Sequence, residues 1–546
     1  MQQDQAATAA TDVRQEVQPG EARGVPGHRI SRRTLYKPAV MLAAAAAMPA
    51  AASAEVATPG AGFDIESRVR ALEPELERTV KTGMAAFDVP GAAVGIVAKD
   101  RLVYAKGFGR RRKGGNEPVG ARTVFQIGST TKAIGSATLA IAVDRGTLKW
   151  DDRVVDLYPP FALKDPYVTR EFRVYDLFAQ RSGLPPYAND LLSGLGFDPD
   201  WLVHSLRFVE PTTSFRSTFT YTNITHLIAG RIAAKALGAP DWPALATREI
   251  VKPLGMRDAS FTAEAIERAG DHAVGHRWTP KGSVAIPFTP LFPYPLGPAG
   301  DINASVEDCA RWVQFQLGNG SFAGRRLVST ENLAVTRTPK VSINEEVAYA
   351  MGWIVTDTPN GRALWHNGGT DGFGAQIGFL PHKGVGTVIL TNQTNKGFPD
   401  AVGLWVFDKL LGNPETDYIK AALARAKDQA AKEAALYRKR AAPQPAPASD
   451  GLVGAYRSDM LGPATLTADG GGLLLTLQQT GARLRLAPFD GALFTVTLMP
   501  EGRFAPVAAG QGDEPSGFAG FEADAEGRLS RLRWTTEGQT FLWQKE

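Results

Sequence analysis

Before residue 150, the spacing of hydrophobic residues predicts three elements. Apolar side chains recur every three or four positions over residues 64–86, which predicts a helix with one buried face. The apolar runs AAVGIVAKD and RLVYAKGFG adjoin at Lys99-Asp100 and predict a β-hairpin. A further apolar stretch runs from Ser129 to about Arg145 and ends at a glycine, which is typical of a helix.

The middle of the chain has the pattern of a mostly helical region inserted into a sheet. From about residue 150 to residue 330, helical stretches alternate with proline-rich loops such as PFTPLFPYPLGPAG. Strand-like runs return at AYAMGWIV, AQIGFL and VGTVILTN, before a helix around residues 404–411. We therefore expect an antiparallel sheet built from both ends of this segment and flanked by helices.

The pattern changes again towards the C-terminus. Residues 416–440 are charged and rich in alanine, as in a helix with a polar face. The run AAPQPAPASD indicates a linker, because prolines at alternate positions cannot continue a helix. Beyond Gly451, about eight short alternating strands with glycine-containing turns predict a small antiparallel barrel or sandwich.

Together these patterns predict an α+β protein with four parts. We assign residues 1–54 to an export signal, 55–412 to the main domain, 413–450 to a charged helix and linker, and 451–546 to an all-β domain. The 546 residues are 44% hydrophobic and 21% charged, which is ordinary for a globular protein. The formal net charge is +4, with no dense basic run outside the N-terminus, so we expect no nucleic-acid partner.

The N-terminus has the features of an export signal. The run SRRTLYK is followed by the apolar stretch AVMLAAAAAMPAAA and by Ala52-Ser53-Ala54, after which cleavage is expected. The paired arginines resemble a bacterial twin-arginine signal, and a general secretory signal is the alternative. The apolar stretch is too short for a comfortable membrane span. We expect a periplasmic or secreted protein without an integral membrane span in its mature chain.

Cysteine and histidine do not indicate a thiol or metal site. Cys309 is the only cysteine, so no intrachain disulfide can form, and its apolar neighbours favour a buried residue over a catalytic thiol. The seven histidines form no H-E-x-x-H motif, and His272 and His276 have no glutamate between them. We expect neither a metal nor an organic cofactor.

Ser129 and Lys132 form an S-x-x-K pair at a helix start. Three positions apart on a helix, they lie on the same face. A serine hydroxyl needs a base to become a nucleophile, and a helix start supplies free N–H groups where an oxyanion would form. A lysine among apolar neighbours loses part of its preference for the charged form and can act as that base. Alone, the pair also fits an N-cap serine beside a solvated lysine.

Two further segments add to this chemistry. The Y-x-N segment from Tyr221 to Asn223 stands at another loop-to-helix junction, where a phenol could relay a proton and an amide could bind substrate. The H-x-G segment from His366 to Gly368 leads into further glycines, which allow close approach of a substrate backbone. Taken singly, these segments also fit a loop tyrosine and a tight turn with a structural histidine.

In this order, the S-x-x-K, Y-x-N and H-x-G motifs resemble the serine β-lactamase and penicillin-binding protein superfamily. The resemblance spans about residues 65–412 and includes the runs RSGLP and GPAGDINASVEDCARW. The nearest branch looks like class C β-lactamases, D-aminopeptidases, D-Ala-D-Ala carboxypeptidases and related carboxylesterases. It implies a β-lactamase-like catalytic domain with a mostly helical subdomain, and the C-terminal strands resemble the barrel often appended to such hydrolases.

The resemblance implies a mechanism through an acyl-enzyme, without a cofactor. The serine would attack an amide or ester carbonyl, and backbone N–H groups would form an oxyanion hole. The residues that it assigns to catalysis are Ser129, Lys132, Tyr221 and His366. Those that it assigns to the oxyanion hole are Ser129 and Gly369. Those that we assign to substrate binding are Asn223, Gly368 and Gln126. His366 would line the wall of the site opposite Asn223.

One departure from the family pattern narrows the substrate. β-Lactamases and many penicillin-binding proteins have a lysine where this chain has His366, whose reference pKa near 6.5 offers at most part of a positive charge at neutral pH. We therefore expect an exported peptidase for short peptides with D- or non-standard residues, a build that linear microcystin peptidases share. A carboxylesterase is the alternative. A β-lactamase or a non-hydrolytic penicillin-binding or sensor protein is less favoured, and the oligomeric state stays open.

Overall fold

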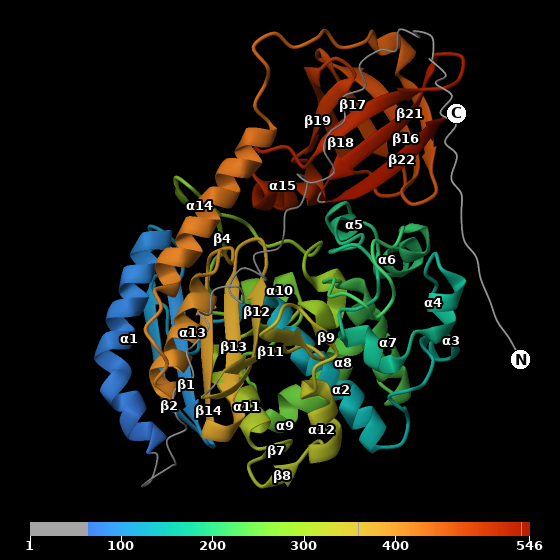
Figure 1. Cartoon of the computed structure of the whole chain (residues 1–546). Helices are drawn as coiled ribbons and strands as arrows, with labels where there is room; N and C mark the ends of the chain where they lie inside the picture. The colour runs from blue at the N-terminus through green and yellow to red at the C-terminus, as the bar shows by residue number, and fades with distance from the viewer. Residues whose placement is uncertain (1–63, 359, 537) are drawn as a thin grey trace, which may run out of the picture. The chain divides into compact units, whose positions relative to one another are not determined.

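Two β-structures organise the chain, an open eight-stranded sheet and a closed barrel (Figure 1). The computed structural model describes residues 64–358, 360–536 and 538–546, which belong to one compact unit. The expected export signal, residues 1–54, lies outside the described residues. Within the described ranges, no helix is both long and apolar enough to cross a membrane.

The open sheet is antiparallel, with the strand order β2-β1-β14-β13-β12-β11-β10-β9. Its strands are β1 (Gly91–Ala98), β2 (Arg101–Gly109), β9 (Val341–Ser342), β10 (Val347–Tyr349), β11 (Ile354–Thr358), β12 (Gly361–Gly369), β13 (Gly374–Leu380) and β14 (Val385–Thr391). β1 pairs with β14 so that Ala92 lies opposite Thr391 and Ala98 opposite Val385. The prediction of a sheet built from both ends of the segment is confirmed.

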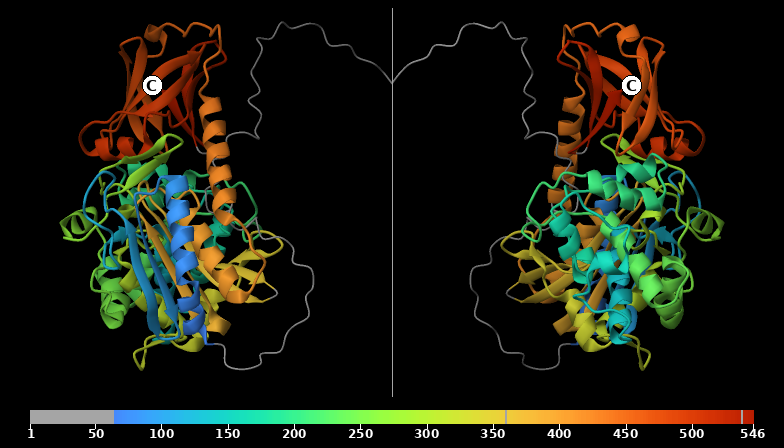
Figure 2. Two further views of the ribbon diagram at one scale, coloured as in Figure 1. Left: turned by 90° about the vertical axis from the view of Figure 1, so that its left-hand side faces the viewer. Right: turned by 90° about the vertical axis from the view of Figure 1, so that its right-hand side faces the viewer.

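Helices cover both faces of this sheet. Every residue of β1 and β14 is buried, as expected for strands enclosed on two sides. Val94 and Ile96 pack in one core with α1 (Ile65–Phe87) and α13 (Phe398–Leu411). The alternate residues Ala93 and Val97 belong to a second core with α2 (Thr131–Asp144) and α11 (Val306–Leu317). Figure 2 shows the blue α1 running along the strands.

The segment between β2 and β9 is mostly helical, as its alternating pattern predicted. Besides α2 and α11 it contains α3 (Val154–Leu157), α4 (Pro166–Glu171), α5 (Leu191–Gly194), α6 (Pro199–Ser205), α7 (Ile224–Ala236), α8 (Trp242–Ala246), α9 (Lys252–Leu254), α10 (Ala263–Arg268) and α12 (Thr330–Arg337). Three short strand pairs interrupt it: β3 (Phe125–Gln126) with β6 (Asn303–Ala304), β4 (His276–Thr279) with β5 (Gly282–Ala285), and β7 (Ser321–Phe322) with β8 (Arg325–Arg326). α2 and α7 pack together and form its centre.

The C-terminal strands close into the predicted barrel. α14 (Tyr418–Leu436) precedes it, and the short α15 (Ala505–Gln511) lies between two of its strands. The strands are β15 (Gly454–Ser458), β16 (Gly462–Asp469), β17 (Gly472–Leu477), β18 (Arg483–Asp490), β19 (Leu493–Leu498), β20 (Phe518–Ala523), β21 (Leu529–Thr536) and β22 (Gln539–Lys545). Pairing of β15 with β22 completes the circle, with Tyr456 opposite Lys545. Closure removes both edge strands, which would otherwise expose unpaired backbone groups.

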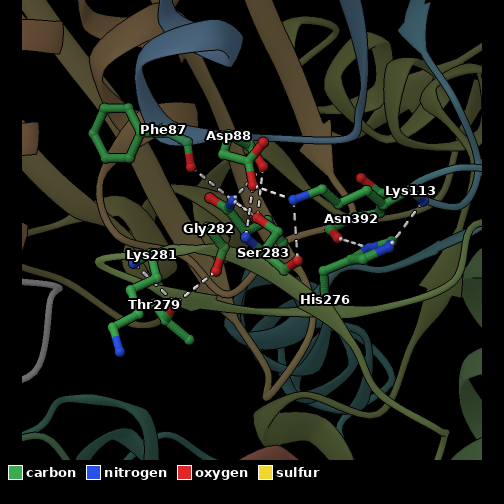
Figure 3. A network of polar contacts seen from close by, with 10 residues as sticks. Phe87, Asp88, Lys113, His276, Thr279, Lys281, Gly282, Ser283 and Asn392 are labelled. Carbon is green, nitrogen blue, oxygen red and sulfur yellow. Dashed lines mark hydrogen bonds and ion pairs between the residues drawn. The ribbon is translucent and has the colours of Figure 1, made fainter.

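A polar network fastens the β4–β5 hairpin to the large sheet (Figure 3). Asp88, which follows α1, accepts hydrogen bonds from the Ser283 N–H and from Lys113 Nζ, both at 2.6 Å. His276 bonds through Nδ1 to the Asn392 carbonyl oxygen (2.8 Å), while its Nε2 accepts the Lys113 backbone N–H (3.1 Å). A ring that donates at Nδ1 and accepts at Nε2 is neutral, in keeping with burial, which lowers the pKa of His276.

Replacement of Asp88 by alanine is expected to destabilise the fold, because the buried Ser283 N–H loses its acceptor. We expect a loss of about 1–3 kcal/mol in the free energy of unfolding, measured by urea denaturation. Asp88→Asn should lose less of the free energy of unfolding, since asparagine keeps an acceptor and tolerates the left-handed backbone at this position (φ 57°). Equal losses for the two variants would contradict this explanation.

Candidate active site

Ser129 lies where a strand turns into a helix. β3 is followed by a 3₁₀ turn, η2 (Gly128–Thr130), and α2 begins at Thr131, so the predicted helix opens with a tighter turn. Gly128 has a φ of 51°, which glycine adopts without strain. Ser129 is 8% exposed. Its amide stands at the N-terminal end of the helix, where N–H groups lack helical partners.

Lys132 is fully buried one helical turn from Ser129. Its Nζ lies 3.0 Å from Ser129 Oγ, and it donates hydrogen bonds to Asn223 Oδ1 (2.6 Å) and to the carbonyl oxygen of Ala299 (2.7 Å). All three partners are uncharged. Burial lowers the pKa of Lys132 well below its usual range, and the negative charge of Asp190 opposes this shift.

Tyr221 lies against Lys132, just before α7. Lys132 Nζ is 4.7 Å from the centroid of the Tyr221 ring. The Tyr221 hydroxyl is buried and has no hydrogen-bond partner among the described residues. Burial raises the pKa of Tyr221 well above its usual range, and the nearby Ser129 side chain offsets part of that shift. The site therefore holds a neutral phenol beside Ser129 and Lys132.

The end of β12 approaches η2 so closely that glycine is required on both segments. A Cβ on Gly368 would lie 2.0 Å from the carbonyl oxygen of Ile127. A Cβ on Gly128 would lie 2.8 Å from the amide nitrogen of Gly369. The N–H of Gly369 is thereby brought beside the turn that carries Ser129, as an oxyanion hole formed by these two amides would need.

Buried side chains hold this strand end from behind. Asn395 Nδ2 donates a hydrogen bond to the carbonyl oxygen of Gly368 (3.0 Å). Asn367 Nδ2 donates to Asp400 Oδ2 (2.9 Å), and burial raises the pKa of the Asp400 carboxyl to about 6. The position of the strand end thus depends on side chains from the C-terminal part of the sheet domain.

His366 does not line the wall of the site, contrary to our expectation. Its side chain is fully buried, with Nε2 2.9 Å from Tyr349 Oη and its ring centroid 6.3 Å from that of Tyr221. Successive side chains of a strand point to opposite faces, and Asn367 reaches the cavity instead. Burial lowers the pKa of His366 to about 3. The part of His366 in proton transfer stays a prediction.

Gln126 also lies outside the wall of the cavity beside Ser129. Its Nε2 donates to Tyr294 Oη (2.9 Å), and its Oε1 accepts from Thr370 Oγ1 (2.8 Å). Both ends of the amide are therefore bonded to protein groups. Gln126 joins β3 to the loop after β12, and the structure does not support the expected substrate contact.

A cavity of about 350 Å³ opens beside Ser129. Four other predicted residues line it, namely Tyr221, Asn223, Gly368 and Gly369. Other lining residues were given no role in the sequence analysis and include Tyr187, Asp190, Leu191, Asn367, Thr370, Asp371, Asn395, Val507 and Gln511. Asn367 lies inside the H-x-G segment, and Thr370 and Asp371 directly follow its glycines. The first three residues come shortly after the RSGLP run and lie outside any motif. The last two come from α15, between two barrel strands.

Gln539, the first residue of β22, holds the segment that carries Tyr187 and Asp190. Its Nε2 donates to the Tyr187 carbonyl oxygen (2.7 Å), and its Oε1 accepts the Asn189 N–H (3.1 Å). Tyr187 and Asn189 have left-handed backbones (φ 56° and 61°), which are uncommon outside glycine. The Tyr187 N–H in turn donates to the carbonyl oxygen of Tyr221 (2.6 Å). A barrel side chain thus supports a site residue through two successive contacts.

In the described part of the chain, neither a metal-ligand cluster nor an exposed thiol is found. No group of three or more His, Cys, Asp or Glu side chains there is placed to hold a metal ion. Cys309 is buried, and burial raises the pKa of its thiol well above the usual range.

Comparison with protein families gives two matches. Residues 76–411 match the Beta-lactamase family, and residues 438–545 match a domain of unknown function, DUF3471. Among curated proteins, an unguisins hydrolase of Aspergillus campestris is 27% identical over 343 residues, covering 59% of this chain and 62% of that protein. Penicillin-binding protein 4 of Amycolatopsis lactamdurans is 26% identical over 318 residues, which cover 56% of this chain and 81% of that protein. Matches to the Aspergillus relatives span less than two thirds of their length, 62% and 66%.

Solved structures share the fold. The octameric penicillin-binding protein homologue from Pyrococcus abyssi aligns with a TM-score of 0.56 and 20% identity, over 86% of this chain and 100% of that one. A class C beta lactamase from Rhodobacter sphaeroides aligns with a TM-score of 0.50 and 20% identity, over 64% of this chain and 97% of that one. At this identity the likeness concerns the arrangement of helices and strands.

The buried lysine leads to a prediction about pH. If neutral Lys132 is the base, kcat/KM should fall on the acid side as Lys132 becomes protonated, with a midpoint well below the usual lysine pKa of about 10.4. His366, with its pKa near 3, should not contribute to this limb. The measurement is a pH profile of kcat/KM for the native chain and for His366→Gln. A limb near pH 6.5 that is lost in the variant would instead assign it to His366.

The barrel contact leads to a second prediction. Gln539→Ala removes both hydrogen bonds to the segment at Tyr187 and should lower kcat/KM on the order of tenfold, since each is worth about 1 kcal/mol. Gln544→Ala is the matched control, because Gln544 lies on the same strand and donates to the exposed Ser530 carbonyl oxygen (2.9 Å). Urea denaturation of both variants separates a loss of positioning from a loss of fold. Equal kinetics for the two variants would contradict the supporting role of Gln539.

Proposed function

The chain belongs to the beta-lactamase family, and on that premise we propose that it is a serine hydrolase that cleaves amide bonds of short peptides through an acyl-enzyme on Ser129. One observation carries the proposal. The fully buried amine of Lys132 lies 3.0 Å from the Ser129 hydroxyl, is bonded only to uncharged groups, and stands behind a cavity that the serine lines. This arrangement meets the needs of an activated nucleophile.

The contacts of Lys132 direct its lone pair. A neutral amine has two N–H donors and one lone pair. The oxygens of Asn223 and Ala299 can only accept, so they take both N–H groups. The lone pair then faces Ser129 Oγ and accepts the hydroxyl proton as the oxygen attacks. Burial favours the neutral amine that this step requires.

The same groups account for the steps that follow. Ser129 Oγ bonds to the carbonyl carbon, and the carbonyl electron pair moves to oxygen, where the N–H groups of Ser129 and Gly369 stabilise it, each worth about 10²–10³ in rate. As the intermediate collapses, the C–N bond breaks and the leaving nitrogen takes the Tyr221 proton. Lys132 returns a proton to the tyrosine. Water then gives a proton to the neutral Lys132 as it attacks the ester carbonyl. The bond from the acyl carbon to Ser129 Oγ breaks, that oxygen takes the proton back from Lys132, and the acid is released.

The wall of the cavity favours a peptide over a simple ester. Side-chain amides and a hydroxyl line it, from Asn223, Asn367, Asn395 and Thr370. Of these, Asn367 Oδ1 has no hydrogen-bond partner among the described residues and can accept a peptide N–H, a donor that a simple ester does not offer. The 27% identical relative named an unguisins hydrolase is consistent with hydrolytic chemistry.

A carboxylesterase remains the second candidate. Leu191, Leu296 and Val507 also line the cavity and offer an apolar surface to an acyl chain. Efficient β-lactam hydrolysis is less favoured, because His366 is neutral and buried where a substrate carboxylate would need a positive charge. A non-hydrolytic penicillin-binding or sensor protein is disfavoured by the intact serine, lysine and tyrosine.

Export belongs to the proposal as well. The run SRRTLYK, the apolar stretch after it and the small residues that end at Ala54 support a twin-arginine type of signal. Export would bring the enzyme to peptides of the periplasm or the surroundings of the cell.

The test compares kcat/KM for a series of D- and L-peptides with kcat/KM for short-chain p-nitrophenyl esters, using the purified chain. We expect peptides to be preferred by orders of magnitude and Ser129→Ala to lose at least about 10³-fold with every substrate. Turnover of esters alone would make the protein a carboxylesterase. Full activity of Ser129→Ala would refute the assigned nucleophile.

A further inference from the structure

The polar network in Figure 3 includes a histidine, His276, that binds two loops of the cavity wall. His276 lies on β4, is fully buried and has no part in the proposed mechanism. One of the two loops follows β12 and the other follows β14. The segments that line the cavity beside Ser129 include residues 369–371 of the first loop and residues 394–395 of the second. His276 itself lies behind this wall.

We propose that His276 is a positioning residue of the active site, which binds the loops after β12 and β14 and thereby fixes the Gly369 N–H of the oxyanion hole. The inference rests on the proposed acyl-enzyme and adds to it a residue outside the cavity. The role differs from fastening the β4–β5 hairpin, because it concerns the two loops that form the wall of the site.

The main chain of His276 joins the two loops. Its N–H donates a hydrogen bond to the carbonyl oxygen of Gly372 in the loop after β12 (3.0 Å). Its carbonyl oxygen accepts the N–H of Thr394 in the loop after β14 (2.9 Å). The Thr394 hydroxyl in turn donates to the carbonyl oxygen of Asp371, which connects the second loop directly to the first. One residue of β4 thus holds both loops at the point where they meet.

Close packing at the same point limits the movement of the loop after β12. A Cβ on Gly372 would lie 2.7 Å from Cα of Gly275, the residue before β4. A Cβ on Gly275 would lie 2.9 Å from a ring carbon of Phe373. Glycine at both positions allows an approach that a side chain would prevent. The loop that follows Gly369 therefore rests directly on the main chain next to His276.

The ring of His276 binds the loop after β14 at a further point. Its Nδ1 donates to the Asn392 carbonyl oxygen (2.8 Å), and its Nε2 accepts the Lys113 N–H (3.1 Å). Asn392 directly follows β14 and lies in the same loop as Asn395, whose Nδ2 holds the Gly368 carbonyl oxygen (3.0 Å). The Nδ1 contact therefore leads to the oxyanion end of β12. The Nε2 contact leads away from it, to the loop after β2.

The two contacts of the ring can be removed separately. An asparagine amide nitrogen takes about the place of Nδ1, so His276→Asn keeps the donor to Asn392. A glutamine amide oxygen takes about the place of Nε2, so His276→Gln keeps the acceptor for the Lys113 N–H. Glutamine also fills more of the space of the ring. Packing alone therefore makes His276→Gln the milder change, whereas the positioning role makes it the more harmful one.

The kinetic test measures kcat and KM of both variants with the substrate that the native chain prefers. We expect His276→Gln to lower kcat about tenfold or more and to change KM less than about threefold, because a displaced oxyanion donor acts on the transition state. His276→Asn should stay within about threefold of the native kcat. The matched control is Thr279→Val, which loses a hydrogen bond at the hairpin tip (2.7 Å to the Gly282 carbonyl oxygen) and should keep the native kcat. Equal kcat values for the two His276 variants, or the reverse order, would overturn the inference.

A measurement without turnover separates this inference from the proposed function. Hydrogen–deuterium exchange is followed by mass spectrometry in peptides that cover residues 366–375 and 391–397. We expect both segments to exchange faster in His276→Gln than in the native chain or in His276→Asn, because the loop after β14 loses its bond to the ring. If the native chain hydrolyses no substrate, the proposed function fails while the exchange still decides the role of His276. Native exchange in His276→Gln refutes that role.

A second variant covers the case in which His276→Gln does not fold. Thr394→Val keeps the shape of the side chain and loses the hydroxyl that donates to Asp371. We expect faster exchange over residues 366–375, since this segment loses a contact with the loop after β14, and native exchange in the barrel strands β17 and β18. Native exchange over residues 366–375 as well would overturn the inference.

Discussion

A lysine amine held out of water beside a serine hydroxyl is the interaction on which this site depends. A charged ammonium group would cost several kcal/mol to bury without a carboxylate partner. Lys132 instead contacts three uncharged groups, from Ser129, Asn223 and Ala299, and its burial favours the neutral amine. Because these partners come from three separate segments of the helical region, the base is assembled only when that region is folded.

The close approach of two backbone segments is the second constraint. An oxyanion hole needs donors placed before the reaction starts, since moving them during the reaction would cost free energy. Here the placement depends on glycine at Gly128 and Gly368, because a side chain at either position would meet backbone atoms of the other segment. Asn395 then holds the strand end through the Gly368 carbonyl oxygen. The close backbone contact that these two glycines allow is thus a requirement of the proposed oxyanion hole.

The barrel shows how a domain without catalytic groups can bear on catalysis. Its sequence predicts alternating strands and no site residue. Gln539 nevertheless bonds to Tyr187 and Asn189, which both have left-handed backbones, in the segment next to Tyr221. α15 also adds Val507 and Gln511 to the wall of the cavity. Strained backbone conformations persist only where their surroundings hold them. The barrel contributes that support, in addition to its own closed core.

What the sequence determined by itself was local or periodic. The S-x-x-K spacing puts Lys132 beside Ser129 on any helix, and the apolar runs and alternating strands predicted the sheet and the closed barrel, because these patterns depend on neighbours along the chain. Only the tertiary structure decided which side of β12 His366 faces, that Gln126 is bonded to Tyr294 and Thr370, and that Asp190 and Gln539 belong near the site. A shift of one residue reverses the face of a strand, and contacts between residues 350 positions apart leave no periodic trace in the sequence.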